Sequence, residues 1–212
     1  MPAQPSRKPP GTLRADAREN RERILTAARE AYALHGIDVP MAAIARRAKV
    51  GVATLYRRFP TRDALVSEAF AEQLAHCVAV LDEGLADPDP WRGFCSVVER
   101  VCMMQATERG FTQAFLSQFP DHAAYAAERG RAEEGLVRLI GRAKDCGQLR
   151  QDFDVHDITL LMLANSGATA GAGDHAPAAS RRLVAYLLQS FRAGATAPLP
   201  PAAPLGLHRI HA

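Results

Sequence analysis

Apolar residues recur at helical spacing along most of the 212-residue chain, and β-branched runs that alternate with polar residues are scarce. Gly36 and Gly147 each follow the last periodic residue of a segment, as a helix-ending glycine does. The pattern predicts helices over residues 16–35, 40–48, 52–59, 61–84, 90–108, 111–118, 122–146, 154–171 and 176–194. The chain is therefore predicted to be all-α, with about nine helices.

The two ends of the chain lack this periodicity. Residues 1–13 hold five prolines or glycines beside Arg7 and Lys8, and residues 196–212 hold four prolines. We expect a disordered arm over 1–13 and a disordered tail over 196–212. Asp16 with Glu19 three residues later has the spacing of a capping box, which predicts that the first helix begins near Asp16.

The two short helices at 40–48 and 52–59 have the pattern of a helix-turn-helix. Ala45 supplies the small contact point that the first helix needs, and Leu55 and Phe59 point apolar side chains inward from the second. Thr61 is placed to cap the helix that follows. We expect a DNA-binding domain over 14–60 and a larger helical domain over 61–195.

The distribution of charge supports a polyanionic partner. Residues 1–60 hold 12 Lys and Arg against 5 Asp and Glu, a net charge of +7, whereas residues 61–212 hold 14 against 18, a net charge of −4. A basic N-terminal part on a mildly acidic body favours contact with DNA.

The stretch from Arg21 to Leu65 resembles the TetR family of one-component regulators. The matching residues are Ile24, Leu25, Ala27, Ala28, Gly36, Ile44, Ala45, Ala48, Val50, Thr54, Leu55, Tyr56, Phe59, Asp63, Ala64 and Leu65. The run Gly147, Gln148, Leu149, Arg150 and Asp152 is similar to the family's link into its dimerisation helices. The resemblance implies a three-helix DNA-binding domain followed by a helical domain that holds a ligand and the dimer contact.

Four residues depart from the family's pattern. Lys49 stands where the turn usually has glycine, and a left-handed conformation there implies strain of about 1 kcal/mol. Gly51 replaces the usual Ser or Thr cap, and Pro40 replaces a Thr that can touch phosphate. Arg62 replaces a Lys, which preserves the possibility of a phosphate contact.

The resemblance implies a DNA-binding transcriptional repressor that a small molecule releases from double-stranded DNA. A homodimer would read a palindromic operator whose half-sites lie about one helical turn apart. Arg57, Arg58 and Arg62 would hold phosphates, and Thr54 would reach base edges. The predicted DNA-binding residues are Arg46, Arg47, Lys49, Gly51, Val52, Ala53, Thr54, Tyr56, Arg57, Arg58 and Arg62.

The larger domain is expected to supply the dimer contact and the effector site. The last two helices present apolar faces for a four-helix bundle, at Ile158, Leu161, Met162, Leu183, Leu187 and Phe191. The candidate residues for a small, largely apolar ligand are Trp91, Phe94, Met103, Met104, Phe111, Phe115, Phe119 and Asn165. Ordinary packing inside the monomer is the alternative for both sets.

No motif in the sequence predicts an enzyme, a cofactor or a metal site. Walker and HExxH motifs are absent, His208 and His211 lack a third ligand, and the four cysteines form no CxxC pair. Without a signal segment or an apolar span of membrane length, we expect a cytoplasmic protein without a membrane partner. Two alternatives stay open: a helix-turn-helix dimer whose C-terminal domain only dimerises or recruits a partner, and an enzyme or carrier with an incidental helix-turn-helix.

Overall fold

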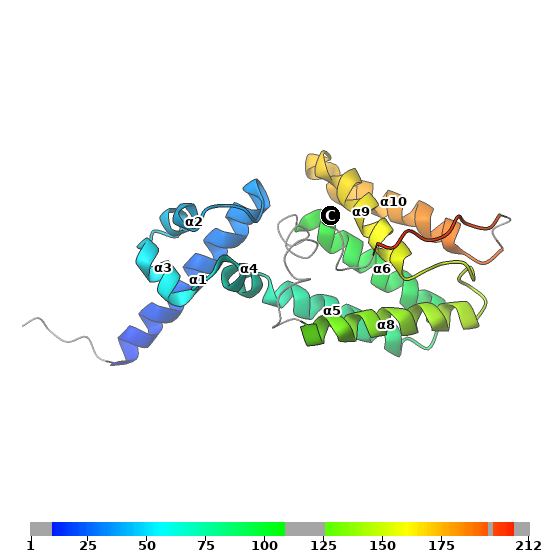
Figure 1. Ribbon diagram of the computed structural model, residues 1–212, viewed down its shortest axis with the longest axis horizontal. Coiled ribbons are helices and arrows are strands. Elements are labelled where there is room, and N and C mark those ends of the chain that lie inside the picture. The colour runs from blue at the N-terminus through cyan, green and yellow to red at the C-terminus, as the bar shows by residue number, and fades with distance from the viewer. Residues whose placement is uncertain (1–9, 109–125, 195–196, 206–212) are drawn as a thin grey trace, which may run out of the picture. The chain divides into compact units, whose positions relative to one another are not determined.

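The computed structural model describes residues 10–108, 126–194 and 197–205, which belong to two helical units, Met1–Ala69 and Phe70–Ala212 (Figure 1). These described residues form nine α-helices and no β-strand, with a single isolated bridge between Leu149 and Arg192. The predicted all-α fold is confirmed.

Four helices build the N-terminal unit: α1 (Pro10–His35), α2 (Met41–Arg47), α3 (Val52–Arg58) and α4 (Arg62–Ala69). α1 packs against α2 and α4, and α2 packs against α3. α1 ends at the expected glycine, because Gly36 adopts a φ of 79° and donates its N–H to the Tyr32 carbonyl at 3.0 Å. The helix begins earlier than predicted, so residues 10–13 are helical; the rest of the predicted arm lies outside the described residues.

The predicted single helix over 61–84 is wrong, because it is divided into α4 and α5 (Ala71–Ala86). Thr61 caps α4 as expected, accepting the Ala64 N–H at 3.1 Å. At the other end, the Arg29 guanidinium donates to the Ala69 carbonyl at 2.6 Å, and Phe70 leaves the helical region with φ −115° and ψ 12°. The N-terminal unit consequently includes α4 and ends at Ala69 rather than at residue 60.

The second unit is organised around α6 (Pro90–Thr107), which contacts α5, α8 (Ala126–Asp145), α9 (His156–Ala170) and α10 (Ala176–Phe191). In Figure 1, α6 runs between the α5–α8 pair and the α9–α10 pair. A short 3₁₀ helix, η3 (Gly173–His175), joins α9 to α10. The predicted helix over 111–118 and the first residues of that over 122–146 lie outside the described residues.

Local signals fix the connection between α5 and α6. The Asp89 carboxylate caps α6 by accepting the N–H groups of Trp91 at 3.0 Å and Arg92 at 3.1 Å. α5 and α6 approach so closely that a Cβ on Gly93 would lie 2.3 Å from the Gly84 carbonyl oxygen. The Arg142 guanidinium of α8 donates to the Asp87 carbonyl at 2.8 Å, which ties α8 to the same turn.

The segment 197–205 is not a free tail, contrary to the prediction for residues 196–212. Arg150 donates to the Ala197 carbonyl at 2.8 Å, and Leu199 donates its N–H to the Asp152 carboxylate at 2.8 Å.

None of the described helices has, by itself, the length and hydropathy of a membrane span. α4 and α5 have that length and hydropathy only when they are counted together across the break between them.

Candidate nucleic-acid interface and ligand cavity

The turn between α2 and α3 is a compact helix-ending motif. Lys49 adopts a φ of 55°, the only positive φ at a non-glycine residue among those the structure describes. Its N–H donates to the Arg46 carbonyl at 3.1 Å, and the Val50 N–H donates to the Ala45 carbonyl at 3.0 Å, which is the Schellman pattern. Lys49 therefore adopts the left-handed conformation for which the sequence implied strain.

α3 has one buried side and one exposed side. Leu55 and the capping residue Phe59 are buried in the unit, and Ala45 of α2 is fully buried beside them, as the helix-turn-helix pattern requires. Val52 and Tyr56 point outward with 42% and 47% of their surface exposed. The exposed residues of α2, the turn and α3 are Ala42, Arg46, Arg47, Lys49, Gly51, Val52, Ala53, Tyr56, Arg57 and Arg58, with Thr54 half-buried among them.

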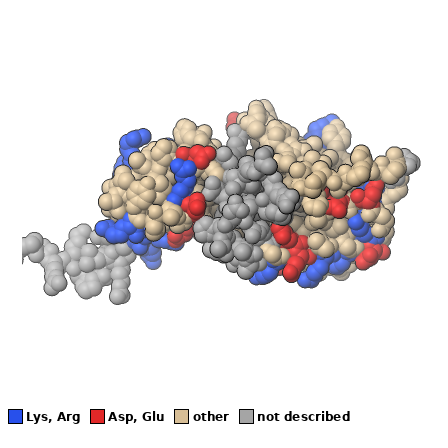
Figure 2. All heavy atoms as spheres, in the orientation of Figure 1, with Lys and Arg blue, Asp and Glu red and all other residues tan. Residues whose placement is uncertain are grey.

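Two of the predicted DNA-binding arginines are paired with acids of the same unit. Arg47 lies 2.8 Å from the Glu30 carboxylate, and Arg62 lies 3.0 Å from the Asp38 carboxylate. No ion pair within the described part of the chain involves Arg57. Figure 2 shows Lys and Arg atoms on the visible face of this unit, with acidic groups beside some of them.

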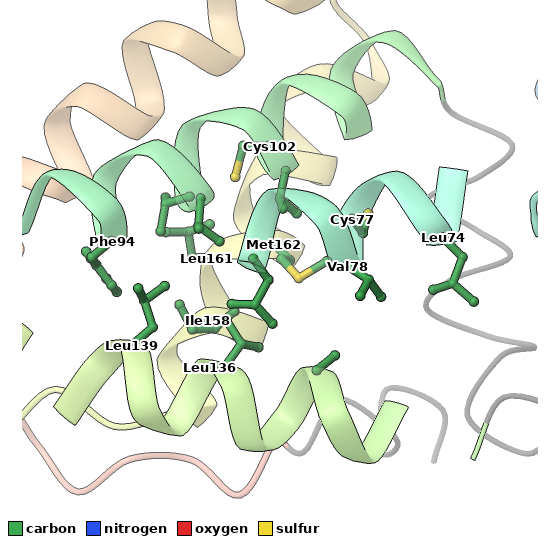
Figure 3. A pocket seen from close by; sticks show the side chains of 15 residues that line it. Leu74, Cys77, Val78, Phe94, Cys102, Leu136, Leu139, Ile158, Leu161 and Met162 are labelled. Carbon is green, nitrogen blue, oxygen red and sulfur yellow. The ribbon is translucent and has the colours of Figure 1, made fainter. Parts of the chain in front are cut away.

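A cavity of about 80 Å³ lies inside the second unit, between α5, α6, α8 and α9 (Figure 3). Its wall consists of apolar side chains and thiols: Leu74, Cys77, Val78, Leu81, Phe94, Val97, Val98, Val101, Cys102, Ala132, Leu136, Leu139, Ile158, Leu161 and Met162. Burial raises the pKa of both Cys77 and Cys102 to about 12, so both thiols are neutral at pH 7. A site without hydrogen-bond partners disfavours water and suits an apolar guest.

The predicted ligand residues are only partly gathered at this cavity. Phe94 forms part of its wall, and Trp91 stacks behind Phe94 with ring centroids 5.6 Å apart. Met103 and Met104 lie outside the wall, because they fall on another side of α6. The predicted residues Phe111, Phe115 and Phe119 lie outside the described residues.

Asn165 is fully buried one helical turn beyond Met162, on the same face of α9 as the cavity wall. Its amide nitrogen donates to the Cys102 carbonyl and to the Gln105 side-chain oxygen, both at 3.0 Å. Within the described part of the chain, its side-chain oxygen is buried without a hydrogen-bond partner. An unmet acceptor therefore lies beside a cavity that is otherwise apolar.

Three residues predicted at the dimer contact belong to the interior instead. Ile158, Leu161 and Met162 are 4–7% exposed and line the cavity, because this face of α9 packs towards α6. An apolar helix face at this spacing is expected both at a dimer contact and in the core of a monomer, so the sequence could not distinguish these two roles. Leu183, Leu187 and Phe191 are half-buried on α10.

Exposed apolar residues gather on another face of α9 and α10. Among the described large hydrophobic residues, Leu160 is 52% exposed, Tyr186 is 55% exposed and Leu199 is 42% exposed. Ala164 and Ala168 are also exposed on α9. We call Leu160, Ala164, Ala168, Leu183, Tyr186 and Leu187 the α9–α10 face. Exposed apolar surface of this kind marks a contact with another molecule.

Comparisons with known proteins match both units. Residues 24–69 match the family model of bacterial regulatory proteins, tetR family, and residues 89–193 match the C-terminal domain model of SbtR-like transcriptional regulators. A search of the curated proteins finds no significant match.

Solved structures of similar proteins agree with the two family models. A TetR transcriptional regulator from Streptomyces coelicolor is 26% identical, with a TM-score of 0.52 over 82% of this chain and 99% of that one. A TetR regulatory protein from Mycobacterium vanbaalenii is 30% identical, with a TM-score of 0.49 over 85% and 99%. SmeT, the repressor of the Stenotrophomonas maltophilia multidrug efflux pump SmeDEF, has the same fold at 18% identity, with a TM-score of 0.58 over 86% and 100%. The chain belongs to the TetR family of transcriptional regulators.

Proposed function

We propose that this regulator is a cytoplasmic, non-enzymatic repressor that binds a two-fold symmetric operator as a homodimer and releases it when a small, largely apolar ligand binds. The observation that carries the proposal is the pairing of two features in one chain. One is a short helix, α3, with a basic exposed side; the other is an apolar cavity in the second unit.

On DNA, α3 is proposed to enter the major groove. Thr54 and Val52 reach base edges and thymine methyl groups, whereas Arg57 and Arg58 hold phosphates. The ion pairs of Arg47 with Glu30 and of Arg62 with Asp38 are exposed, so exchanging an acid for a phosphate has a small cost. The basic residues set affinity, and the small and polar residues set specificity.

Dimerisation is proposed to use the α9–α10 face. Leu160 and Tyr186 are more than half exposed, and the small side chains of Ala164 and Ala168 allow a second helix to approach closely. Two such helix pairs would form a four-helix bundle around a two-fold axis. The dimer would then present two copies of α3 to one operator.

The cavity is the proposed effector site. α5 supplies Leu74, Cys77 and Leu81 to its wall, and only Phe70 separates α5 from the last residue of α4 in the chain. A ligand that displaces α5 would therefore pull on α4 of the DNA-binding unit, because the two helices are consecutive in the chain. The presence of this cavity favours a ligand-responsive regulator over one whose second unit only dimerises.

Operator binding is tested by selection from a pool of random double-stranded DNA. The expected product is a palindrome with half-sites about one helical turn, or 10 base pairs, apart. Selection of an asymmetric site, or no enrichment over the starting pool, would contradict the proposal. The substitution Thr54→Ala should relax the preference at one position of each half-site while leaving the half-site spacing unchanged.

Ligand release is tested with a variant that fills the cavity. Ala132→Phe places a ring where α8 borders the cavity, at an overpacking cost of about 1–3 kcal/mol. Toluene should stabilise the wild type and lower its affinity for the operator. The variant should bind the operator, and toluene should change neither its stability nor its operator affinity. Val137→Phe, on the exposed side of the same helix, shows whether the added ring acts through the cavity. An unchanged response of Ala132→Phe to toluene would contradict the assignment of the cavity.

A further inference from the structure

The C-terminal segment 197–203 is held in place by a pair of charged residues, Arg150 and Asp152, in the α8–α9 connection. Arg150 donates to both carboxylate oxygens of Asp152, at 2.5 and 2.8 Å, and the same guanidinium donates to the Ala197 carbonyl at 2.8 Å. Asp152 accepts the Leu199 N–H at 2.8 Å. Hydrogen bonds from Arg150 and from the Leu199 N–H lower the pKa of Asp152, so its carboxylate is charged at neutral pH.

An apolar groove of about 330 Å³ lies between this segment and the last two helices. α9 lines it with Asp157, Leu160, Leu161 and Ala164, and α10 lines it with Leu187 and Phe191. Asp152 also lines it, so the groove is apolar except for two carboxylates. The segment itself supplies Leu199, Pro200, Pro201, Ala202 and Ala203. Leu160, Ala164 and Leu187 line the groove and also belong to the α9–α10 face, so the groove lies on that face. The segment is the red trace after α10 in Figure 1.

Leu160 and Leu199 remain about half exposed even though the segment is seated beside them. The residues that the structure describes therefore do not cover this apolar surface. Proline-rich backbone has little conformational freedom to lose, which makes a tethered segment suitable for an interface. The groove is continuous with the proposed dimer contact, because Leu160, Ala164 and Leu187 belong to both.

We propose that the segment 197–203 is part of the dimer contact, and that a second copy of this chain inserts apolar side chains into the groove. The Arg150–Asp152 pair acts as a clasp that positions the segment before the two copies meet. The inference rests on the proposed dimer and extends it, because it gives a contact role to residues beyond α10.

The direct test is the dimer dissociation constant of the full-length chain, measured by sedimentation equilibrium. Leu199→Asp places a charge in the groove and should weaken the dimer by about tenfold or more, the effect of losing one buried apolar anchor. Val137→Asp is the matched control, because Val137 is 56% exposed on α8 and lies outside the groove. This control should leave the dissociation constant within about twofold of the wild type.

Truncation gives a second, independent measurement. A chain that ends at residue 196 should dimerise as weakly as Leu199→Asp, whereas a chain that ends at Leu205 should dimerise like the wild type. Asp152→Ala, which removes the acceptor of the Leu199 N–H, should have a dimer dissociation constant between those of the two truncated chains. Circular dichroism before and after thermal unfolding checks that each variant keeps its helices.

The outcomes separate this inference from the proposed function. A wild type that is a monomer at all concentrations overturns the dimer and this inference together. A dimeric wild type with an unchanged Leu199→Asp variant overturns only the role of the segment. A truncated chain that dimerises more tightly than the wild type also overturns it, since the segment would then mask the face instead of extending it.

Discussion

Single residues decide how α3 is presented, and Lys49 shows this most clearly. A local sequence pattern predicts its left-handed conformation, because the turn between two short helices leaves one position that must reverse the backbone. Leu55 and Phe59 are assigned to the core for the same local reason, and both are buried. These features are predictable because the spacing of residues within the two short helices and their turn is enough to indicate them.

Replacing Lys49 with glycine should stabilise the N-terminal unit. Relief of the left-handed strain at φ 55° is expected to raise the free energy of unfolding by about 1 kcal/mol, less the extra freedom glycine gains in the unfolded chain. Urea denaturation of Lys49→Gly and Lys49→Ala measures this. Alanine removes the same side chain but keeps the strain, so equal stability of the two variants would contradict the explanation.

Asn165 is expected to select ligands that donate a hydrogen bond. Its buried side-chain oxygen has no partner, and a phenol hydroxyl could supply one where toluene, with the same number of heavy atoms, could not. Calorimetry should show phenol binding better than toluene by about tenfold in the wild type, and more weakly than toluene in Asn165→Leu, where the buried hydroxyl has no acceptor. Thr159→Val removes another buried, unpartnered oxygen from α9 and should leave the preference intact. A preference that survives Asn165→Leu would refute the assignment.

At the scale of elements, helix positions follow from the sequence but their partners do not. The break between α4 and α5 depends on Arg29 reaching the Ala69 carbonyl from 40 residues away, which no local pattern encodes. The apolar face of Ile158, Leu161 and Met162 could have met a second copy or the chain's own core, and only the packing of α9 on α6 decides for the core. The segment after α10 has the composition of a tail, and its anchors, Arg150 and Asp152, precede it by almost 50 residues.

The Asp89 cap should be a substantial contribution to the stability of the second unit. Asp89→Ala removes two hydrogen bonds at the start of α6, the helix that contacts every other α-helix described in that unit, and should cost about 0.5–2 kcal/mol. Thermal unfolding followed by circular dichroism gives the difference. Asp174→Ala removes an exposed carboxylate from η3 and should change stability by less than about 0.5 kcal/mol. Equal losses from both substitutions would rule out a special role for the cap.

At the scale of the whole molecule, charge and apolar surface are divided between the two units. The basic excess lies in the first 60 residues, whereas the cavity and the α9–α10 face belong to the second unit. The net charge of +7 within those 60 residues is enough to predict which unit contacts DNA, because a polyanion is attracted to the basic part of a chain. Composition could not predict the cavity, because the same apolar residues would serve equally well as a closed core.

The central claim, that α3 carries the DNA-binding surface, is tested most directly by the salt dependence of operator affinity. The double variant Arg57→Ala/Arg58→Ala should bind the operator more weakly than the wild type. The slope of its log affinity against log salt concentration should also be shallower, by about 0.9 for each lost phosphate contact. Arg131→Ala/Arg138→Ala, which removes two exposed arginines from α8, should keep the wild-type affinity and slope. If the α3 variant instead retains both the affinity and the slope of the wild type, the DNA-binding surface lies elsewhere and the account is wrong.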